Sequence, residues 1–452
     1  VATNRVFTNE TTGVGFYLFP SIQIGAYAIT VKAPGMNTWE GKVNLMAGQI
    51  ASIDVLLQPA TAETKVTVAG DVTPLVTTTS ATVATVLERQ RIEQLPVNGR
   101  TIQTLIYMTV PGTESGSVPR VYGLKYASEF VQDGAVLVNR ESEGAPNRMP
   151  GLDTIGEFRA ETSVSSAKMN RPGTFIMTTR SGSNEIHGAL FETARNSGIG
   201  VARARQDYYS KPPHLVRNEF GASVGAPVFL PKLYNGKNRT FFFFSYEGFQ
   251  LRQESTRSIA LPTAAMRQGD FSGLMDGSGR TYTIYDPWST GANWSRVPYV
   301  NNQIPITKQS PLAKYLYSIT PMPNRPDNPL VTSNWYGTGF VRTKQHTETT
   351  RFDHRLTDND QLTFRYTHSP SSGERTSNPW GGSPTTLDGR ANAYIDEGQN
   401  DNGTANWTHT FSPTFFSEAL VTVSRDYRGQ LPYTHGEEIA STLGLSNPFN
   451  GI

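Results

Sequence analysis

Hydrophobic and polar residues alternate along most of the second half of the chain. In the stretch 217–224, Phe220, Ala222 and Val224 occupy even positions, whereas the odd positions are polar or small. A period of two residues is typical of a β-strand with one apolar and one polar face. We therefore expect antiparallel strands after residue 184.

Two longer stretches keep this alternation on both sides of a short turn. The turn of the first hairpin is "TDND" (357–360), and that of the second is "TFSPTF" (410–415). Arg351, Arg355 and Arg365 lie on one face of the first hairpin, and its other face is apolar. The apolar faces of both hairpins and of "FFFFSYEGF" (241–249) carry Phe242, Phe244, Tyr246, Leu362, Phe364, Tyr366, Val421 and Val423.

The first half of the chain has other patterns. Alternation in 16–31, followed by two short strands about a turn at Gly48, predicts a small antiparallel sandwich. The next stretch is rich in Thr, Val and Ala, which is typical of a linker. Helical spacing then appears in 92–106, and a mixed α/β unit is expected to follow as far as Gly182.

Composition narrows the function classes. The 452 residues include 40 basic and 38 acidic side chains, so net charge gives no argument for a nucleic-acid partner. There is no cysteine, which excludes disulfides and thiolate chemistry. Mean hydropathy is −0.40, and no run approaches the roughly 18 apolar residues of a membrane-spanning helix. A membrane, if one is crossed, is crossed by strands.

The loops favour an outer-membrane β-barrel. Short turns separate the strands at one end, and long Gly-, Pro- and Asn-rich segments (about 255–340 and 370–400) separate them at the other. A core strand of a soluble sandwich is the alternative for 241–249 alone. A soluble sheet, however, would bury the arginine face of the first hairpin at a cost of roughly several kcal/mol for each unpaired charge.

In a barrel, the eight apolar residues named above face lipid. Ser245 and Glu247 then face the aqueous lumen. Phe241 and Phe243 are expected near a strand end, in the aromatic girdle at the membrane surface.

Several segments, in order, resemble the TonB-dependent outer-membrane transporters, and among them the Oar-like receptors. "TNETTGVGFYLFPSIQIGAYAITVKAPGM" is similar to their N-terminal carboxypeptidase-regulatory-like domain, which has a carbohydrate-binding-like fold. "QLPVNGRTIQTLIYMTVPG" and "EFVQDGAVL" look like parts of the plug, and "FIMTTRSGSNEIHGALFETARN" like its end and the first barrel strand. The resemblance covers nearly the whole chain. "IGAY" stands where "PGTY" is usual, which puts ligand contacts of the first domain in doubt.

The resemblance implies a mainly β protein in four parts. These are a truncated periplasmic β-sandwich (1–60), a linker (61–79), an α/β plug domain (80–184) and the first strands of an antiparallel transmembrane β-barrel with long external loops (185–452). The complete barrels of the family have about 22 strands. We expect about seven here, with the start of the first domain and most of the barrel missing.

The resemblance also implies a receptor or transporter in the outer membrane of a Gram-negative bacterium. Its partners would be outer-membrane lipid, a large solute (an oligosaccharide, peptide or chelate) and the TonB complex of the inner membrane. TonB pulls on a short extended segment of the receptor, using the proton-motive force, and captures it as an added strand. The candidate TonB box is Lys65, Val66, Thr67 and Val68; the alternative is the last strand of the first domain or a plain linker.

Enzymatic motifs are weak. His435 and Glu438 have the spacing of a zinc pair, but with 14 residues after Glu438 we expect no third ligand. "TRSGSNE" lacks the setting of a nucleophile elbow, and "TDND" and "QNDNGT" lack the spacing of a calcium loop. We therefore predict no catalytic residue, metal or cofactor. The loop aromatics Trp294, Tyr299, Trp335 and Tyr336 could stack on sugar rings or serve as interfacial anchors.

Two other function classes stay open at this point. One is a cell-surface binding or adhesion protein that transports nothing, and the other is a secreted hydrolase. Plug and loops would determine the solute with ordinary polar and aromatic residues, so the sequence does not name it.

Overall fold

The computed structural model describes residues 6–19, 22, 24–46, 49–60, 66–71, 83–95, 97, 99–114, 119–137, 149–163, 169–199, 214–376, 394–412, 414–432, 441 and 444. Strands dominate these residues. Three units follow one another along the chain: a small N-terminal sheet, an α/β unit and a large antiparallel sheet.

The large sheet, hereafter the barrel sheet, has seven strands in the order in which they occur in the sequence. All neighbouring pairs are antiparallel. The strands are β11 (His187–Asn196), β12 (Leu215–Pro227), β15 (Thr240–Ile259), β16 (Trp335–Arg355), β17 (Asp360–Thr376), β18 (Tyr394–Ser412) and β19 (Phe415–Pro432). This confirms the predicted strand count, and the sheet is not closed: β11 and β19 form its two edges.

The predicted hairpin turns are confirmed, but several strands are longer than expected. Arg355 pairs with Gln361 across the first turn, and Ser412 pairs with Phe415 across the second. β15 continues to Ile259 and β16 begins at Trp335. Both strands therefore include residues of the segment about 255–340 that was expected to be a loop. A membrane-spanning strand needs only about 9–11 residues, so β15 and β16, with 20 and 21 residues, are about twice as long as such a strand. A small hairpin, β13 (Phe229–Leu230) and β14 (Tyr234–Asn235), lies in the turn between β12 and β15.

The α/β unit has a five-stranded mixed sheet in the order β4-β9-β10-β7-β8. The two helices are α1 (Arg89–Gln94) and α2 (Ile102–Thr109), as their spacing predicted. The Thr101 hydroxyl caps α2 by accepting a hydrogen bond from the Thr104 amide. The strands of the sheet are β4 (Val83–Glu88), β7 (Ser128–Gln132), β8 (Ala135–Leu137), β9 (Ile155–Ser163) and β10 (Gly173–Thr179). The unit also contains a short pair, β5 (Thr113–Glu114) and β6 (Arg120–Val121), and the 3-10 turn η1 (Leu152–Thr154), whereas the 3-10 turn η2 (Ser197–Ile199) follows β11 of the barrel sheet.

A single apolar core holds this unit together. Leu105 and Ile106 of α2 are fully buried against the sheet. Phe175 lies between Phe130 and Phe158, with ring centroids 5.1 and 6.1 Å apart. Burial of large aromatic side chains is worth about 1.5–3 kcal/mol each, so this core fixes where the turns of the unit are presented.

The N-terminal unit differs from the sandwich that the pattern predicted. Its described residues form one three-stranded sheet, β1 (Gly25–Val31), β2 (Thr38–Leu45) and β3 (Val66–Asp71). Residues 16–18 and 49–58 alternate in sequence but form no strand, so that part of the prediction was wrong. Alternation of apolar and polar residues shows only that an extended chain would have one apolar face. To form a β-strand, the backbone also needs a hydrogen-bonding neighbour. β2 has both its edges occupied by β1 and β3.

The segment between β15 and β16, residues 260–334, is an ordered external unit. It contains α3 (Ala264–Arg267), η3 (Pro287–Ser289), η4 (Ala292–Trp294), η5 (Val300–Asn302), η6 (Ile306–Lys308) and α4 (Pro311–Ile319). The two ends of this unit are joined by the fully buried Asn334. Its side-chain amide accepts a hydrogen bond from the Leu261 amide at 2.7 Å and donates one to the Leu261 carbonyl at 2.9 Å.

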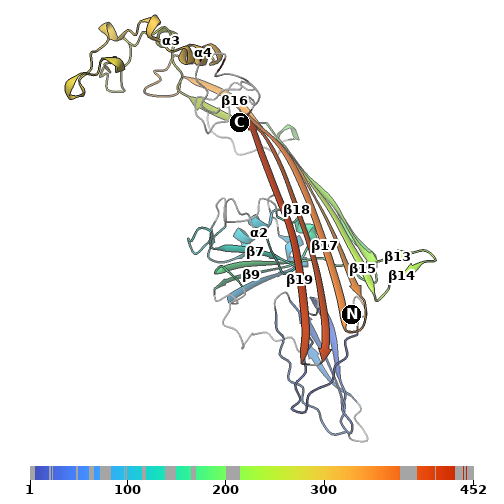
Figure 1. The fold of residues 1–452 in the computed structure, drawn as a ribbon. Coiled ribbons are helices and arrows are strands. Elements are labelled where there is room, and N and C mark those ends of the chain that lie inside the picture. Colours follow the sequence, from blue (N-terminus) through green and yellow to red (C-terminus); the bar gives the residue numbers. More distant parts are fainter. Residues whose placement is uncertain are drawn as a thin grey trace.

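Figure 1 shows how these units are arranged. The α/β unit lies against one side of the curved barrel sheet, the N-terminal strands lie beyond the end with the short turns, and the external unit projects from the opposite end. Among the described residues, no helix combines the length and the apolar character needed to span a bilayer.

Candidate functional site: the interface between the α/β unit and the barrel sheet

The inner face of the barrel sheet, which contacts the α/β unit, is polar yet buried. Successive strand residues point to opposite faces, so one alternating set of side chains faces the α/β unit. Direct contacts identify this set: the Thr154 hydroxyl lies 2.8 Å from that of Ser245, and the Glu247 carboxylate accepts from the Asp153 amide at 3.0 Å. The predicted inward placement of Ser245 and Glu247 is confirmed.

A cluster of four charged side chains, Asp133, Arg351, Asp353 and Arg365, joins the two units across this interface. Asp133 lies at the turn between β7 and β8, where Asp133 and Gly134 both have positive φ (49° and 82°), as an Asp-Gly hairpin turn requires. Its carboxylate accepts hydrogen bonds from the amide and the hydroxyl of Thr179 at 2.9 and 2.6 Å. The same carboxylate lies 3.4 Å from Arg351 Nη1 and 2.8 Å from Arg365 Nε.

The two arginines belong to the barrel sheet and lie directly opposite each other on β16 and β17. Arg351 makes a bidentate pair with Asp353, both distances being 2.9 Å, and donates to the Thr179 carbonyl at 2.6 Å. Arg365 is fully buried and donates to Thr367, Asn402 and Thr404. Two guanidinium groups and two carboxylates therefore balance inside the interface. Buried charges are tolerated only when they are paired in this way.

A second group of charges lies at the 3-10 turn η1. Asp153 is buried and pairs with Arg89 at 2.6 Å and with Arg100 at 3.1 Å. Its amide donates to Glu247 of β15, and Gly151 lies so close to the Glu247 carboxyl that a Cβ would be 1.9 Å from Oε1. A larger residue at this position would push the Glu247 carboxylate away from the Asp153 amide. Arg100 also lies over the Phe191 ring of β11, 4.0 Å from its centroid.

Phe241 and Phe243 do not lie in an aromatic girdle, so that expectation was wrong. Both are buried on the inner face, and Phe243 is fully buried with Arg180 at 5.2 Å from its ring centroid. Their register puts them on the same side as Ser245, and that side is covered by the α/β unit. Strand parity, rather than closeness to the strand end, decides their environment.

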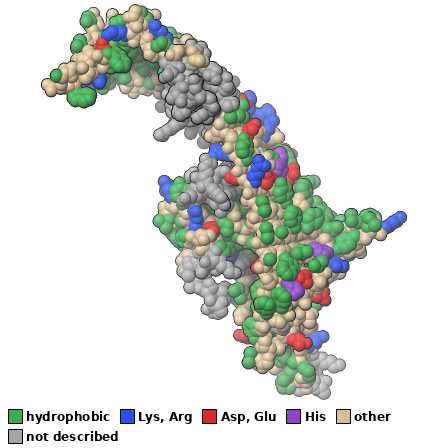
Figure 2. All heavy atoms as spheres, viewed as in Figure 1, with side chains coloured by type: hydrophobic (Ala, Val, Ile, Leu, Met, Phe, Trp, Pro, Cys, Tyr) green, Lys and Arg blue, Asp and Glu red, His purple; other side chains and the backbone are tan. Residues whose placement is uncertain are grey.

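The outer face of the barrel sheet is apolar between two polar levels. At one level, Asp360 pairs with His409 at 2.6 Å; at the other, Asp401 pairs with His368 at 2.7 Å. Asp360 and His368 lie eight positions apart on β17, which is about 26 Å of strand at 3.3 Å per residue. A tilt of 35–45° gives roughly 20 Å of height, close to the apolar band of a membrane barrel. Figure 2 shows hydrophobic side chains gathered over the barrel strands.

All eight residues predicted to face lipid lie on this outer face. Phe364 and Val421 pair with the same residue, Ala405, midway between the two polar levels. Exposed fractions on β17 and β19 are 47% for Phe364 and 64% for Val421, although both are apolar. The remaining members are Phe242, Phe244, Tyr246, Leu362, Tyr366 and Val423.

The candidate TonB box lies at the edge of the N-terminal sheet. Val66, Thr67 and Val68 belong to β3, which pairs in parallel with Thr38, Trp39 and Glu40 of β2. Lys65 lies outside the described residues. The sequence analysis expected an extended linker segment here. The backbone is extended, but Val66–Asp71 is paired with β2 as the third strand of the N-terminal sheet, so for these residues the linker prediction was wrong and the alternative, a last strand of the first domain, describes them.

The external unit presents a different set of aromatics from the one the sequence indicated. Of the four named earlier, Trp294 is 85% exposed, whereas Trp335 is buried and Tyr336 stacks under Arg325 at 3.9 Å. Tyr299 lies under Lys308 Nζ, 5.6 Å from its ring centroid. Trp288, which the sequence analysis did not single out, is 89% exposed on η3.

Metal-binding and catalytic arrangements were also sought. In the part of the chain that the structure describes, no group of three His, Asp or Glu residues is placed to hold a metal. His435 and Glu438 lie outside the described residues. Residues 357–360 form the turn between β16 and β17, where Thr357 Oγ1 donates to Asp360.

Comparison with known proteins agrees with this architecture. The family model described as "Outer membrane beta barrel domain" matches residues 178–452. The chain therefore belongs to the outer membrane beta barrel family, and it is a protein of the outer membrane. No curated protein matches it in sequence.

Solved structures with some similarity are outer-membrane receptors. The ferric enterobactin receptor PfeA of Pseudomonas aeruginosa is 11% identical, with a TM-score of 0.42, over 78% of this chain and 42% of that one. The ferric-catecholate import receptor Fiu of E. coli K12 is 14% identical (TM-score 0.39; 78% and 51%), and the alcaligin receptor FauA of Bordetella pertussis is 11% identical (0.35; 79% and 49%). The chain thus spans about half the length of these receptors.

Proposed function

We propose that this chain is part of a TonB-dependent outer-membrane receptor that takes up a large solute. The single observation that carries the proposal is the position of the α/β unit, which is seated on the polar inner face of the barrel sheet through the Asp133 and Asp153 clusters. A unit in that position closes the lumen as a plug. Transport then requires that the plug be moved, and movement requires work.

The order of the units along the chain indicates the side from which the plug is pulled. β3 precedes the α/β unit and lies with the N-terminal strands, at the end of the barrel sheet that has the short turns. In a membrane barrel this end faces the periplasm. A force applied to Val66–Asp71 from that side is transmitted along the polypeptide to β4, which is the edge strand of the α/β unit.

TonB would take hold of β3 by adding a strand to it. β3 is an edge strand, so one side of its backbone faces no other strand among the described residues. Capture can therefore use this free edge or can replace β2. The outer face of the barrel sheet, with its apolar band between the Asp360 and Asp401 levels, is the lipid-facing surface in this proposal.

The test uses the full-length receptor in its own outer membrane. A growth screen of a deletion strain on oligosaccharides, peptides and iron chelates first identifies the solute.

Val66→Pro and Val68→Pro remove backbone donors from β3, so we expect uptake to be lost while surface binding of the solute is unchanged. Val66→Thr keeps the donor and is the matched control. Full uptake by both proline variants would show that this segment is not the TonB box.

A surface-binding role without transport is the second candidate, because Trp288 and Trp294 are both more than four-fifths exposed on the external unit. Exposed aromatic side chains are common anchors of binding interfaces. This role predicts that replacing both by alanine removes binding, and that loss of TonB has no effect on the phenotype. Uptake that stops in a strain without TonB would exclude it as the main function.

A further inference from the structure

We propose that Arg351 and Arg365 form an anion-binding site on the barrel wall, which Asp133 fills at rest and an anionic group of the solute fills when the α/β unit moves. The transport part rests on the proposed function. The binding part rests on the geometry of the barrel wall alone.

The first step is the placement of the two arginines. Arg351 and Arg365 are direct cross-strand partners on the inner face, and both are at least nine-tenths buried. Like charges placed directly opposite each other on a sheet repel and are destabilising. A pair of this kind needs carboxylates or other anions close by.

The second step is the source of the balancing charges. Asp353 belongs to β16, so it stays with Arg351 wherever the α/β unit goes. Asp133 belongs to the α/β unit and leaves with it. The other acceptors of Arg365 are the uncharged side chains of Thr367, Asn402 and Thr404. Without Asp133, the site holds two guanidinium groups and one carboxylate, and it has one net positive charge.

The third step is the fit of Asp133 itself. Its two carboxylate oxygens are divided between the arginines: one lies 2.8 Å from Arg365 Nε and the other 3.4 Å from Arg351 Nη1, so neither guanidinium receives both oxygens. Carboxylates and phosphates bind guanidinium groups best in a planar bidentate geometry. An anion that is free to orient can therefore satisfy Arg365 better than the side chain that now faces it.

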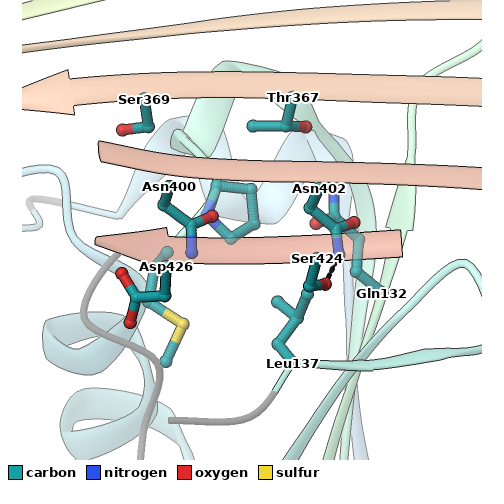
Figure 3. Close-up of a pocket in the computed structure, with 10 residues that line it drawn as sticks. Gln132, Leu137, Thr367, Ser369, Asn400, Asn402, Ser424 and Asp426 are labelled. Atoms are coloured by element: carbon teal, nitrogen blue, oxygen red, sulfur yellow. Dashed lines mark hydrogen bonds between the residues drawn. The ribbon is translucent and has the colours of Figure 1, made fainter. Parts of the chain in front are cut away.

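The fourth step is access. A cavity of about 30 Å³ lies beside the cluster, between the α/β unit and strands β17, β18 and β19 (Figure 3). Gln132, next to Asp133 in the chain, lines it together with Thr367 and Asn402, two of the acceptors of Arg365. The other lining residues are Leu137, Met149, Pro150, Ser369, Asn400, Ser424 and Asp426. Nine of the ten lining residues are uncharged, and the tenth, Asp426, is acidic. The cavity is about the size of one water molecule, so it marks the seam at which the arginines become accessible to a larger anion when the α/β unit moves.

The experiment removes the carboxylate of Asp133 and supplies an anion in solution. The thermal unfolding midpoint of the full-length receptor in detergent micelles is measured against inorganic phosphate, with chloride keeping the ionic strength constant. We expect no phosphate-specific shift in the wild type. In Asp133→Asn, phosphate should raise the midpoint by about 2–4 °C and saturate, because it binds only the folded protein.

Three further variants make the result decisive. Asp358→Asn removes an exposed carboxylate paired with Arg355 at a turn and should show no phosphate effect. Asp133→Asn combined with Arg365→Gln should lose the effect. Asp133→Ser also removes the charge, and it replaces Asp133→Asn if that variant does not fold. Equal phosphate responses in the Asp133 and Asp358 variants, or a response that survives loss of Arg365, would overturn the proposal.

This experiment is independent of TonB. If phosphate binds as expected while the proline variants of β3 keep full uptake, the anion site stands and the energised transport fails. If the proline variants lose uptake and no phosphate effect is found, the transport proposal stands and the anion site fails.

Discussion

The inner and outer faces of the barrel sheet reverse the usual relation between burial and polarity. On the inner face, Arg365, Thr349 and Ser245 are at most 1% exposed, whereas on the outer face Phe364, Val421 and Val423 are 47–70% exposed. On β17 the two kinds of environment are one residue apart, because Phe364 and Arg365 are neighbours in the chain. The inner face meets a fitted polar partner, whereas the outer face has no protein partner among the described residues and is the surface that we propose faces hydrocarbon.

The largest expected effect is on the inner face. Arg351→Met removes a buried charge that pairs with Asp133 and Asp353, and it should destabilise the docked α/β unit by about 3–5 kcal/mol, because two carboxylates stay buried with fewer partners. Urea-dependent protease cleavage within the α/β unit measures this. Arg342→Met is the control: its partner Glu374 is a third exposed and the pair should be worth at most about 1 kcal/mol. Equal sensitivity of both variants would contradict the buried network.

The second effect is on the outer face. Val421→Arg places a charge midway between the two polar levels, where arginine costs about 2–4 kcal/mol in lipid. Leu431→Arg lies on the same face of β19, beyond the Asp401 level, and should cost about 0–1 kcal/mol. Urea titration of the receptor folded in phospholipid vesicles compares the two. A cost that does not depend on position would show that this face does not contact the bilayer.

The third effect sharpens the boundary between the two units. Thr154 and Ser245 are almost fully buried and share one hydroxyl–hydroxyl hydrogen bond at 2.8 Å. Ser245→Ala or Thr154→Val alone leaves one buried hydroxyl without its partner, at about 1–3 kcal/mol, whereas the double variant should be nearly neutral. A double-mutant cycle by the protease assay measures the coupling. Additive losses would mean that the two hydroxyls do not interact.

The smallest effect lies outside both faces, in the external unit. A hydrogen bond from Lys308 holds the pKa of Asp286 below its usual value, and the Trp288 amide adds to this. A depressed folded-state pKa gives stability that is present above the unfolded pKa of about 3.9 and is lost as pH falls through the folded value. Fluorescence of the segment around Trp288 should therefore be constant from neutral pH to about pH 4 and change below it.

Lys308→Met is the control for this titration. Without the ammonium group the pKa of Asp286 rises toward its usual value, so the transition should move to higher pH. An unchanged transition in this variant would show that the pair does not order the segment.

Much of the architecture follows from local patterns. The period-two alternation gave the seven strands, the hairpin turns at 357–360 and 410–415, and the outward set from Phe242 to Val423. Helical spacing gave α1 and α2, and Asp133-Gly134 is a recognisable turn. The second layer of the N-terminal sandwich was expected from alternation alone, and the described residues contain one sheet.

The site was harder to predict because its members are far apart in sequence. The sequence indicated that Arg351 and Arg365 face inward, but no pattern near residue 133 shows that its carboxylate lies between them. Likewise, nothing in the run of four phenylalanines shows that Arg180 covers Phe243. Such pairings depend on how two separately folded units meet, and sequence periodicity describes only one unit at a time.

By itself, then, the sequence determined which side of each strand is apolar, because a side chain's direction along a strand depends only on its parity. The tertiary structure alone decided what each side meets. It brought a carboxylate from the α/β unit to two arginines of the wall, and it placed β3 on β2. The physical reason is that buried charges and unpaired strand edges are satisfied by partners distant in sequence, which only the folded chain brings together.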